Sequence, residues 1–158
     1  MKKITYQLAT MNHIDLLVQS RIDFLEDHWG KQEKTAVDTL RTELQKYFDT
    51  TVASGEYIAV IAMNENKLIA VGGVVLRWQP GSFKIPEGKI GYIMNMYTVP
   101  EFRKQGISSA ILDLLLEESK KQGYTVFELH ATKLGESVYI KNGFYKHSEP
   151  TYRKFLTE

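Results

Sequence analysis

The chain contains no cysteine. This absence excludes disulfides, thiolate metal sites and a cysteine nucleophile, and it is compatible with a reducing compartment. The chain also lacks a dominant charge, since 20 basic residues stand against 19 acidic ones and the net charge is +1. Nucleic-acid-binding proteins usually carry a basic excess or a basic stripe. We therefore expect a small-molecule site and no nucleic-acid partner.

Long apolar segments are missing as well. The longest apolar run, Ile69–Leu76, is far shorter than the roughly 20 residues that a membrane span requires. The first residues, Met1–Tyr6, lack the apolar core of a signal peptide. These features predict a cytoplasmic protein with no membrane partner. The histidines are scattered without metal-ligand spacing, so we also expect no metal.

The composition that remains is typical of one soluble globular domain. The chain has 158 residues, of which 43% are apolar and 25% are charged. This length suffices to bury a real hydrophobic core. Because no repeat, low-complexity tract or long linker interrupts the sequence, we expect residues 1–158 to form a single domain.

Hydrophobic periodicity indicates an α/β protein with a mixed sheet of about seven strands flanked by about four helices. Predicted strands are Ile4–Leu8, Tyr57–Met63, Leu68–Trp78, Ile90–Val99, Val126–Ala131 and two strands of a closing hairpin between Phe144 and Leu156. Predicted helices are one capped by Thr10 or Asn12, one from about Glu33 to Val52, one from about Ile107 that stops at Gly123, and Leu134–Asn142.

The most informative stretch joins the strand before Pro100 to the helix that follows. Its loop carries a basic pair, Arg103 and Lys104, and then the small residues Gly106, Ser108 and Ser109. Free N–H groups and the helix dipole attract anions at a helix start, small side chains let a phosphate approach, and basic side chains add charge-assisted contacts. We therefore expect a diphosphate site. Taken alone, the spacing Arg-x-x-Gly-x-Ser is equally compatible with helix capping on a solvated loop.

Two further segments give the loop a specific context. The loop resembles the acetyl-CoA-binding signature of the GCN5-related N-acetyltransferase (GNAT) family, Arg/Gln-x-x-Gly-x-Gly/Ala. It is preceded by Met96–Phe102, which resembles the family's strand ending, and followed by Ser137–Phe144, which resembles its Leu-Tyr-x-x-x-Gly-Phe segment. The order of elements matches that fold over nearly the whole chain. One position departs from the pattern, since Ser108 stands where the family usually has Gly or Ala.

The resemblance implies a mostly antiparallel, twisted sheet and acetyl-CoA as cosubstrate. It also implies direct transfer of the acetyl group to a bound amine, with Tyr139 donating a proton to the departing thiolate. A phenol suits this role because it is neutral at pH 7 and can donate; the alternative is a tyrosine that only packs against Phe144. The residues expected to contact the coenzyme are Met96, Tyr97, Thr98, Val99, Arg103, Lys104, Gln105, Gly106, Ile107, Ser108, Ser109 and Ser137.

The acceptor side is less informative. The strand Ile90–Val99 contains no acidic residue that would take a proton from the amine, although Asn95 can hold a water there. We therefore expect an ordered-water relay. Other candidate bases, each also readable as a solvated or structural residue, are Glu26, Asp27, Glu128 and His130. Aromatic residues that either line an acceptor pocket or pack in the core are Phe24, Trp29, Trp78, Tyr92 and Tyr97.

The leading hypothesis is an N-acetyltransferase that moves the acetyl group of acetyl-CoA to a primary amine of a small molecule or protein in a ternary complex. The alternative is a non-catalytic acyl-CoA-binding sensor or interaction module. The sequence contains no Gly-Lys-Ser/Thr phosphate loop, so it does not support a nucleotide-dependent kinase. It also contains no Gly-x-Ser-x-Gly elbow, which argues against a serine hydrolase. Since dimers are common in the resembling family, a homodimer is a candidate state.

Overall fold

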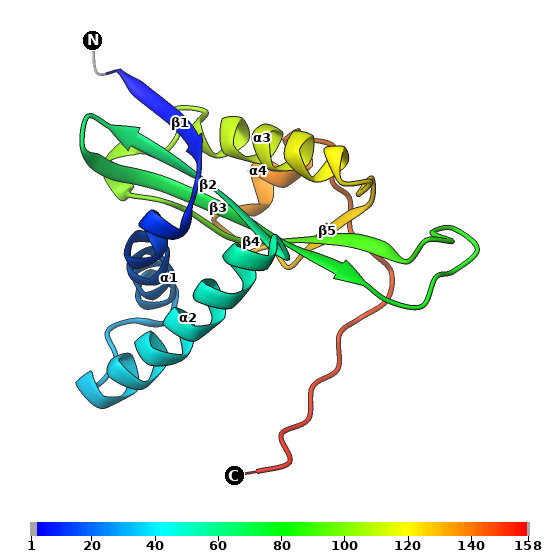
Figure 1. Cartoon of the computed structure of the whole chain (residues 1–158), viewed down its shortest axis with the longest axis horizontal. Helices are drawn as coiled ribbons and strands as arrows, with labels where there is room; N and C mark the ends of the chain where they lie inside the picture. The colour runs from blue at the N-terminus through cyan, green and yellow to red at the C-terminus, as the bar shows by residue number, and fades with distance from the viewer. Residues whose placement is uncertain (1–2, 158) are drawn as a thin grey trace.

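The computed structural model describes residues 3–157, which are built around one five-stranded sheet (Figure 1). Strands β1 to β4 pair antiparallel with their neighbours, and β5 pairs parallel with β4. This confirms the predicted mixed, mostly antiparallel sheet. In their order across the sheet, the strands are β1 (Ile4–Leu8), β2 (Tyr57–Asn64), β3 (Lys67–Trp78), β4 (Lys89–Thr98) and β5 (Phe127–Leu129).

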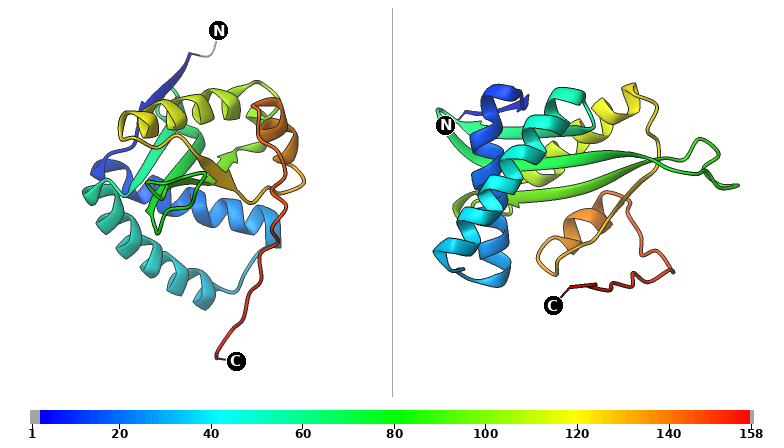
Figure 2. Two further views of the ribbon diagram at one scale, coloured as in Figure 1. Left: turned by 90° about the vertical axis from the view of Figure 1, so that its right-hand side faces the viewer. Right: turned by 60° about the horizontal axis from the view of Figure 1, so that its bottom comes forward.

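Helices cover both faces of this sheet (Figure 2). One face is covered by α1 and α2, and the other by α3. No helix of residues 3–157 is long and apolar enough to cross a membrane. The helices are α1 (Ile14–Trp29), α2 (Lys34–Ser54), α3 (Ile107–Lys121) and α4 (Glu136–Lys141), with single 3₁₀ turns η1 (Met11–His13) and η2 (Pro100–Phe102).

Strand β2 shows why the sheet needs cover on both faces. Its residues alternate between two hydrophobic clusters, as the period of a strand requires. Val60 and Ala62 pack in the cluster that contains Leu112 of α3. Ala59 and Ile61 pack in the cluster that contains residues of α1 and α2. A strand that is apolar on both sides therefore dictates a helix layer above and below the sheet.

The C-terminal part of the prediction is wrong. Residues 144–157 contain no strand and no helix, so the expected hairpin is absent and the sheet has five strands rather than about seven. The segment carries a strand-like pattern, but a strand exists only where its backbone groups pair with a neighbour. In Figure 1 the segment instead runs away from the sheet as an extended chain. The predicted strand Val126–Ala131 is also shorter, because only Phe127–Leu129 pair with β4.

We expect the two neighbouring aromatic residues of α2 to contribute unequally to stability. Phe48 is 1% exposed and packs against the ring of Tyr57, whereas Tyr47 is 38% exposed. Phe48→Ala should lower the free energy of unfolding by about 3 to 5 kcal/mol, the cost of emptying a buried aromatic site. Tyr47→Ala should cost clearly less. Urea denaturation of both variants measures the difference, and equal losses would contradict this assignment of the core.

Candidate functional site

A cleft of about 530 Å³ lies between α1, β4, the start of α3 and the region of α4. Segments far apart in the sequence form its walls, and the sequence-predicted residues Val99 and Gln105 are not among them. Val99 packs against the core, and the Gln105 amide donates to the carbonyl oxygen of Glu101 at 3.3 Å. The sequence-predicted residues that do line the cleft are Met96, Tyr97, Thr98, Arg103, Lys104, Gly106, Ile107, Ser108, Ser109, Ser137 and Tyr139.

A bulge in β4 shapes the floor of the cleft. The pairing of β3 with β4 shifts between Val71 and Gly73, so that one residue, Gly72, lies opposite Asn95 and Met96. A side chain at Gly72 would overlap with that of Met96, which explains the glycine. Asn95 has a left-handed backbone with φ 58°. Whereas a regular strand presents alternate residues to one side, every residue from 92 to 98 lines the cleft.

Asn95 leaves one polar atom in the cleft wall without a partner. Its side chain is 6% exposed, and its Nδ2 donates to the Tyr57 hydroxyl at 2.9 Å. Burial raises the pKa of Tyr57 well above its usual value, so that this phenol stays neutral. The Asn95 Oδ1 is buried and has no hydrogen-bond partner among the described residues. An unsatisfied buried oxygen is costly, so this atom is suited to accept a hydrogen bond from a water or ligand in the cleft.

The loop before α3 has the geometry of an anion site. Lys104 and Gly106 both adopt left-handed conformations, with φ of 60° and 78°. The first N–H bonded in helical fashion is that of Ala110, which donates to the Gly106 oxygen at 3.1 Å. The N–H groups of residues 107–109 precede it and have no helical acceptor, at the positive end of a 15-residue helix. A Cβ at Gly106 would meet nothing within 4 Å, so the space in front of the loop is open.

Arg103, predicted to contact the coenzyme, lines the cleft and also makes contacts within the protein. Its Nε donates to the Thr98 oxygen at 2.8 Å, and its Nη2 contacts the Asp27 carboxylate at 2.9 Å. The guanidinium also lies 5.8 Å from the centre of the Tyr97 ring. Arg103 therefore links the loop to β4 and α1.

Two serine hydroxyls tie the loop to its neighbours. Ser108 Oγ lies 3.1 Å from Thr98 Oγ1 at the end of β4. Ser109 Oγ accepts a hydrogen bond from Asn142 Nδ2 at 3.0 Å, just after α4. The Ser109–Asn142 bond links the loop motif to the Tyr139 motif across 33 positions of sequence. The Ser108 departure from the family pattern thus contributes a contact to β4.

Tyr139 of α4 faces the cleft and also packs in the protein. Its ring meets that of Phe144 edge-on, with the ring centres 5.9 Å apart. Burial, together with the nearby Tyr92, raises the pKa of Tyr139 to about 12. No hydrogen bond links its hydroxyl to another residue within 3–157. Tyr139 can therefore pack against Phe144 and line the cleft at the same time.

The acceptor-side candidates divide between the cleft and other places. His130 and Tyr92 line the cleft and are joined by a 2.6 Å contact between Nδ1 and the phenol oxygen. Asp27 also lines the cleft, but it is paired with Arg103. Phe24 and Tyr97 line it too, whereas Glu26, Glu128, Trp29 and Trp78 do not.

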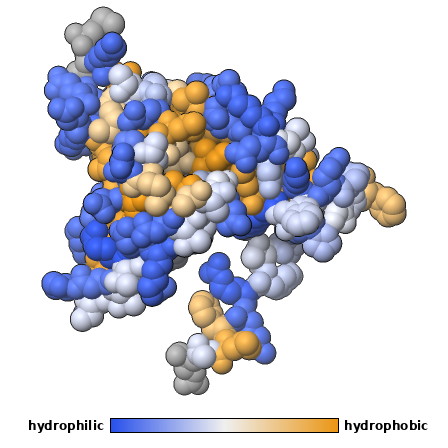
Figure 3. Space-filling model, viewed as in Figure 1, coloured by the Kyte–Doolittle hydropathy of each residue, from blue (hydrophilic) through white to orange (hydrophobic). Residues whose placement is uncertain are grey.

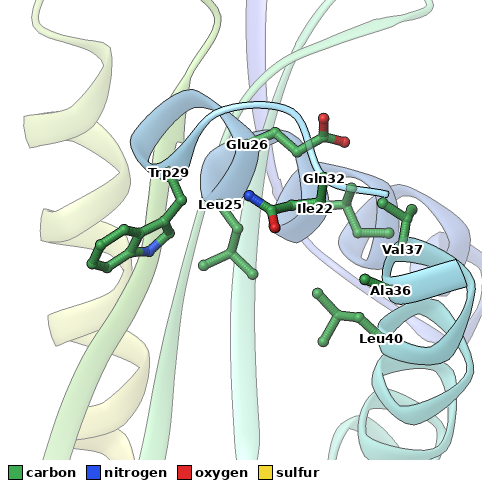
Figure 4. A pocket seen from close by; sticks show the side chains of 8 residues that line it. All are labelled: Ile22, Leu25, Glu26, Trp29, Gln32, Ala36, Val37 and Leu40. Carbon is green, nitrogen blue, oxygen red and sulfur yellow. The ribbon is translucent and has the colours of Figure 1, made fainter. Parts of the chain in front are cut away.

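A second hollow between α1 and α2 holds two of these excluded candidates (Figure 4). Its volume is about 430 Å³ and its lining is mostly aliphatic. Glu26 lies at its edge and pairs with Lys31 at 3.2 Å. No strand residue lines this hollow, so it offers no strand bulge along which a thioester could lie. Its lining residues are Ile22, Leu25, Glu26, Trp29, Gln32, Ala36, Val37 and Leu40.

Comparison with known proteins decides the family. The model of the acetyltransferase (GNAT) family matches residues 20–144. The chain belongs to the GNAT family. No curated protein matches this GNAT chain.

Solved structures agree in fold. A predicted acetyltransferase with acetyl-CoA from Clostridium acetobutylicum is 33% identical, with 99% of each chain covered and a TM-score of 0.89. A GCN5-related N-acetyltransferase from Ralstonia eutropha JMP134 is 20% identical, with 96% of this chain and 99% of that chain covered and a TM-score of 0.85. For glucosamine-6-phosphate N-acetyltransferase from Arabidopsis thaliana, the identity is 19%, the coverage 96% and 99%, and the TM-score 0.69. The last two show the fold alone.

Some cleft residues of this GNAT chain carried no sequence signal. Arg21 lines the cleft from α1, and Thr132 and Lys141 line it from the segment around α4. Arg21 lies 5.6 Å from the centre of the Phe24 ring and is partly buried, which lowers its pKa. Its position in sequence is that of an ordinary charged residue on an amphipathic helix. Only the three-dimensional arrangement separates it from the solvated arginines.

Proposed function

We propose that this GNAT protein is an acetyl-CoA-dependent N-acyltransferase. It transfers the acetyl group directly to a primary amine of a small molecule or a protein, within a ternary complex and as a single domain spanning residues 1–158 in the cytoplasm. The observation that carries the proposal is the convergence of three features on one cleft. These are the free N–H groups at the start of α3, the bulge of β4 and the Tyr139 phenol.

The donor side rests on main-chain groups. The N–H groups of residues 107–109 bind the pyrophosphate of the coenzyme, and Lys104 adds a charge-assisted contact. The thioester lies along β4 at Met96–Thr98, where a main-chain N–H polarises its carbonyl. Acetyl-CoA in the related Clostridium acetobutylicum structure supports this choice of donor. Main-chain donors are suited to the task because they are already oriented before the reaction begins.

The chemical step needs a proton at sulfur. The amine nitrogen attacks the thioester carbonyl carbon, the C–N bond forms and the C–S bond breaks with its electron pair on sulfur. Tyr139 donates a hydrogen bond and then its proton to the developing thiolate. The proton lost by the amine passes to water and restores the phenol. Because the pKa of Tyr139 is raised to about 12, the phenol is protonated before each turnover.

Removal of the amine proton is assigned to an ordered water. The described β4 strand, Lys89–Thr98, contains no carboxylate, and Asp27 of the cleft wall is engaged by Arg103. The unpartnered Asn95 Oδ1 is the group suited to accept a hydrogen bond from such a water. Because these residues supply no strong base, a non-catalytic acyl-CoA-binding sensor is the alternative function.

An acceptor screen tests the proposal. The wild-type chain is incubated with acetyl-CoA and a panel of primary amines, including polyamines, amino sugars and lysine- or N-terminal-amine peptides. We expect amine-dependent release of coenzyme A with at least one class, and mass spectrometry should find the acetylated amine. Coenzyme binding by calorimetry without turnover on any acceptor would favour the sensor. Failure to bind acetyl-CoA would exclude both functions.

The coenzyme loop is tested by a matched glycine pair. Gly106 and Gly55 both have left-handed backbones, with φ of 78° and 80°, and neither has an atom within 4 Å of an added Cβ. Gly106→Glu should abolish acetyl-CoA binding in calorimetry, because it places bulk and negative charge at the pyrophosphate. Gly55→Glu, at the end of α2, carries the same backbone strain and should bind normally. Equal affinities in the two variants would place the coenzyme elsewhere.

Tyr139→Phe tests the proton donor. The variant keeps the ring contact with Phe144, so KM for acetyl-CoA should change little while kcat falls by about 100-fold or more. Tyr145→Phe, at a phenol that is 89% exposed, is the matched control and should behave as wild type.

The pH profile adds a second check on Tyr139. A raised pKa means that the phenol loses its proton only at strongly basic pH. The wild-type rate should therefore rise with pH as the acceptor amine deprotonates, without a falling limb from Tyr139 below its pKa of about 12. A falling limb in mildly basic solution that vanishes in Tyr139→Phe would contradict the assigned pKa shift.

A further inference from the structure

Arg21 of α1 is a partly buried arginine that lines the cleft, yet it forms no hydrogen bond or ion pair with any residue of 3–157. By contrast, Arg41, Arg77 and Arg103 each contact an oxygen of another side chain at 2.8 to 3.5 Å. Burial lowers the pKa of Arg21, but an arginine keeps its charge in proteins. A cation that is partly withdrawn from water without a counter-charge is costly. Its guanidinium is therefore suited to bind an anion.

The surroundings of Arg21 are rings and phenols rather than carboxylates. Its guanidinium lies 5.6 Å from the centre of the Phe24 ring, and the phenols of Tyr57 and Tyr92 are near enough to act on its charge. The Tyr57 hydroxyl also accepts the 2.9 Å bond from Asn95 Nδ2. Arg21 and the unpartnered Asn95 Oδ1 are therefore both near one neutral phenol. This part of the cleft offers one cationic donor and one free acceptor.

The other charges of the cleft do not neutralise Arg21. The remaining charged side chains that line it are Asp27, Arg103, Lys104 and Lys141. Asp27 is thus the one carboxylate among the lining residues of 3–157, and Arg103 holds it at 2.9 Å. Lys104 and Lys141 belong to the loop before α3 and to α4, whereas Arg21 comes from α1, which covers the opposite face of the sheet from α3. A polyamine would find no free carboxylate here.

The cleft is open to a small ligand from solvent. Within residues 3–157, none after Lys141 lines it, and Figures 1 and 3 show the end of the chain standing apart from the body of the molecule. Its volume of about 530 Å³ is typical of a site for one small molecule. Because the reacting end of the coenzyme occupies part of this volume, the acceptor that shares it is small.

We propose that Arg21 binds an anionic group, a carboxylate or a phosphate, on an acceptor whose primary amine lies beside Asn95. This assignment rests on the proposed acetyl transfer. The acceptor is then a small zwitterion, such as an amino acid or an amino phosphate, with a few bonds between its amine and its anionic group. The planar fork of the guanidinium can bind either group through two hydrogen bonds. The amine lies at the water held by Asn95 Oδ1, next to Met96, along which the thioester is placed.

Matched acceptor pairs test this substrate class. The pairs are glycine and glycinamide, β-alanine and β-alaninamide, and phosphoethanolamine and ethanolamine. In at least one pair, we expect kcat/KM of the wild-type chain to be about 10-fold or more higher for the anionic member. An anion raises the pKa of a nearby amine and so lowers the fraction of free amine, which means that amine ionisation does not explain such a preference. The carboxylate and phosphate pairs show which group is recognised. A wild type that prefers the neutral member of every pair would overturn the proposal.

Arg21→Gln tests the residue itself. It should lower kcat/KM for the anionic member by about 10- to 100-fold, leaving the neutral member and KM for acetyl-CoA unchanged. Arg21→Lys keeps the charge without the fork and should retain part of the preference. Arg41→Gln, at an exposed arginine of α2, is the matched control and should behave as wild type. Equal losses on both members of a pair, equal losses in the Gln and Lys variants, or a raised KM for acetyl-CoA would each overturn the role of Arg21.

A binding measurement separates this inference from the proposed reaction. The chain saturated with coenzyme A is titrated by calorimetry with the same pairs. Binding that is selective for anionic members and is lost in Arg21→Gln, without turnover of any amine, would contradict the acetyl transfer but support the anion site. Turnover of neutral amines alone would support the reaction and overturn the anion site. Absence of both turnover and anion-selective binding would overturn the two together.

Discussion

The packing of α3 against β2 and β3 is the constraint on which the cleft depends. Ile111, Leu112 and Leu115 are each at most 1% exposed and lie in one cluster with residues of both strands. This packing determines where the helix begins, and so where its free N–H groups point. The bulge of β4 lies over the same contact, because Gly72 is flanked by Met96 and Ile111. The free helix start and the strand surface beside it therefore both depend on the packing of the core.

The geometry of the cleft also depends on the link between α1 and the loop before α3. Arg103 contacts both the end of β4 and Asp27, so one side chain connects the loop before α3 with β4 and with α1. Exposed ion pairs of this kind contribute little to stability, typically below about 1 kcal/mol. Its importance is geometric, since it sets how the two walls face each other. Arginine suits this position because its planar fork can bond two acceptors at once.

The sequence predicted those features that depend on local pattern. Periodicity located the helices and β1 to β4, and the spacing around Gly106 located the free helix start. It did not predict the bulge at Asn95, because a bulge depends on the register between two strands and no single strand encodes it. It also did not predict the bond of Arg103 to Asp27, which spans 76 positions of sequence.

The C-terminal segment shows the limit of periodicity most clearly. Residues 144–156 include four aromatic residues, which favour strands, yet they form no strand within the described chain. A strand pattern states that a segment can pair, but the partner depends on which edge it can reach. Thr151 contacts His130, 21 positions away in sequence, and a hydropathy pattern contains no information on such a contact.

The surroundings of Gly106, which lines the cleft, and of Gly72, which lies in β3 behind it, imply different evolutionary constraints. Gly72 is enclosed by Met96 and Ile111, so a substitution there would be removed by selection for folding, whatever the protein binds. Gly106 borders open space, so a substitution there would strain only its own backbone and would be removed mainly through loss of ligand. In a lineage that abandoned the reaction, position 106 would drift early, while position 72 would stay glycine for as long as the protein folds.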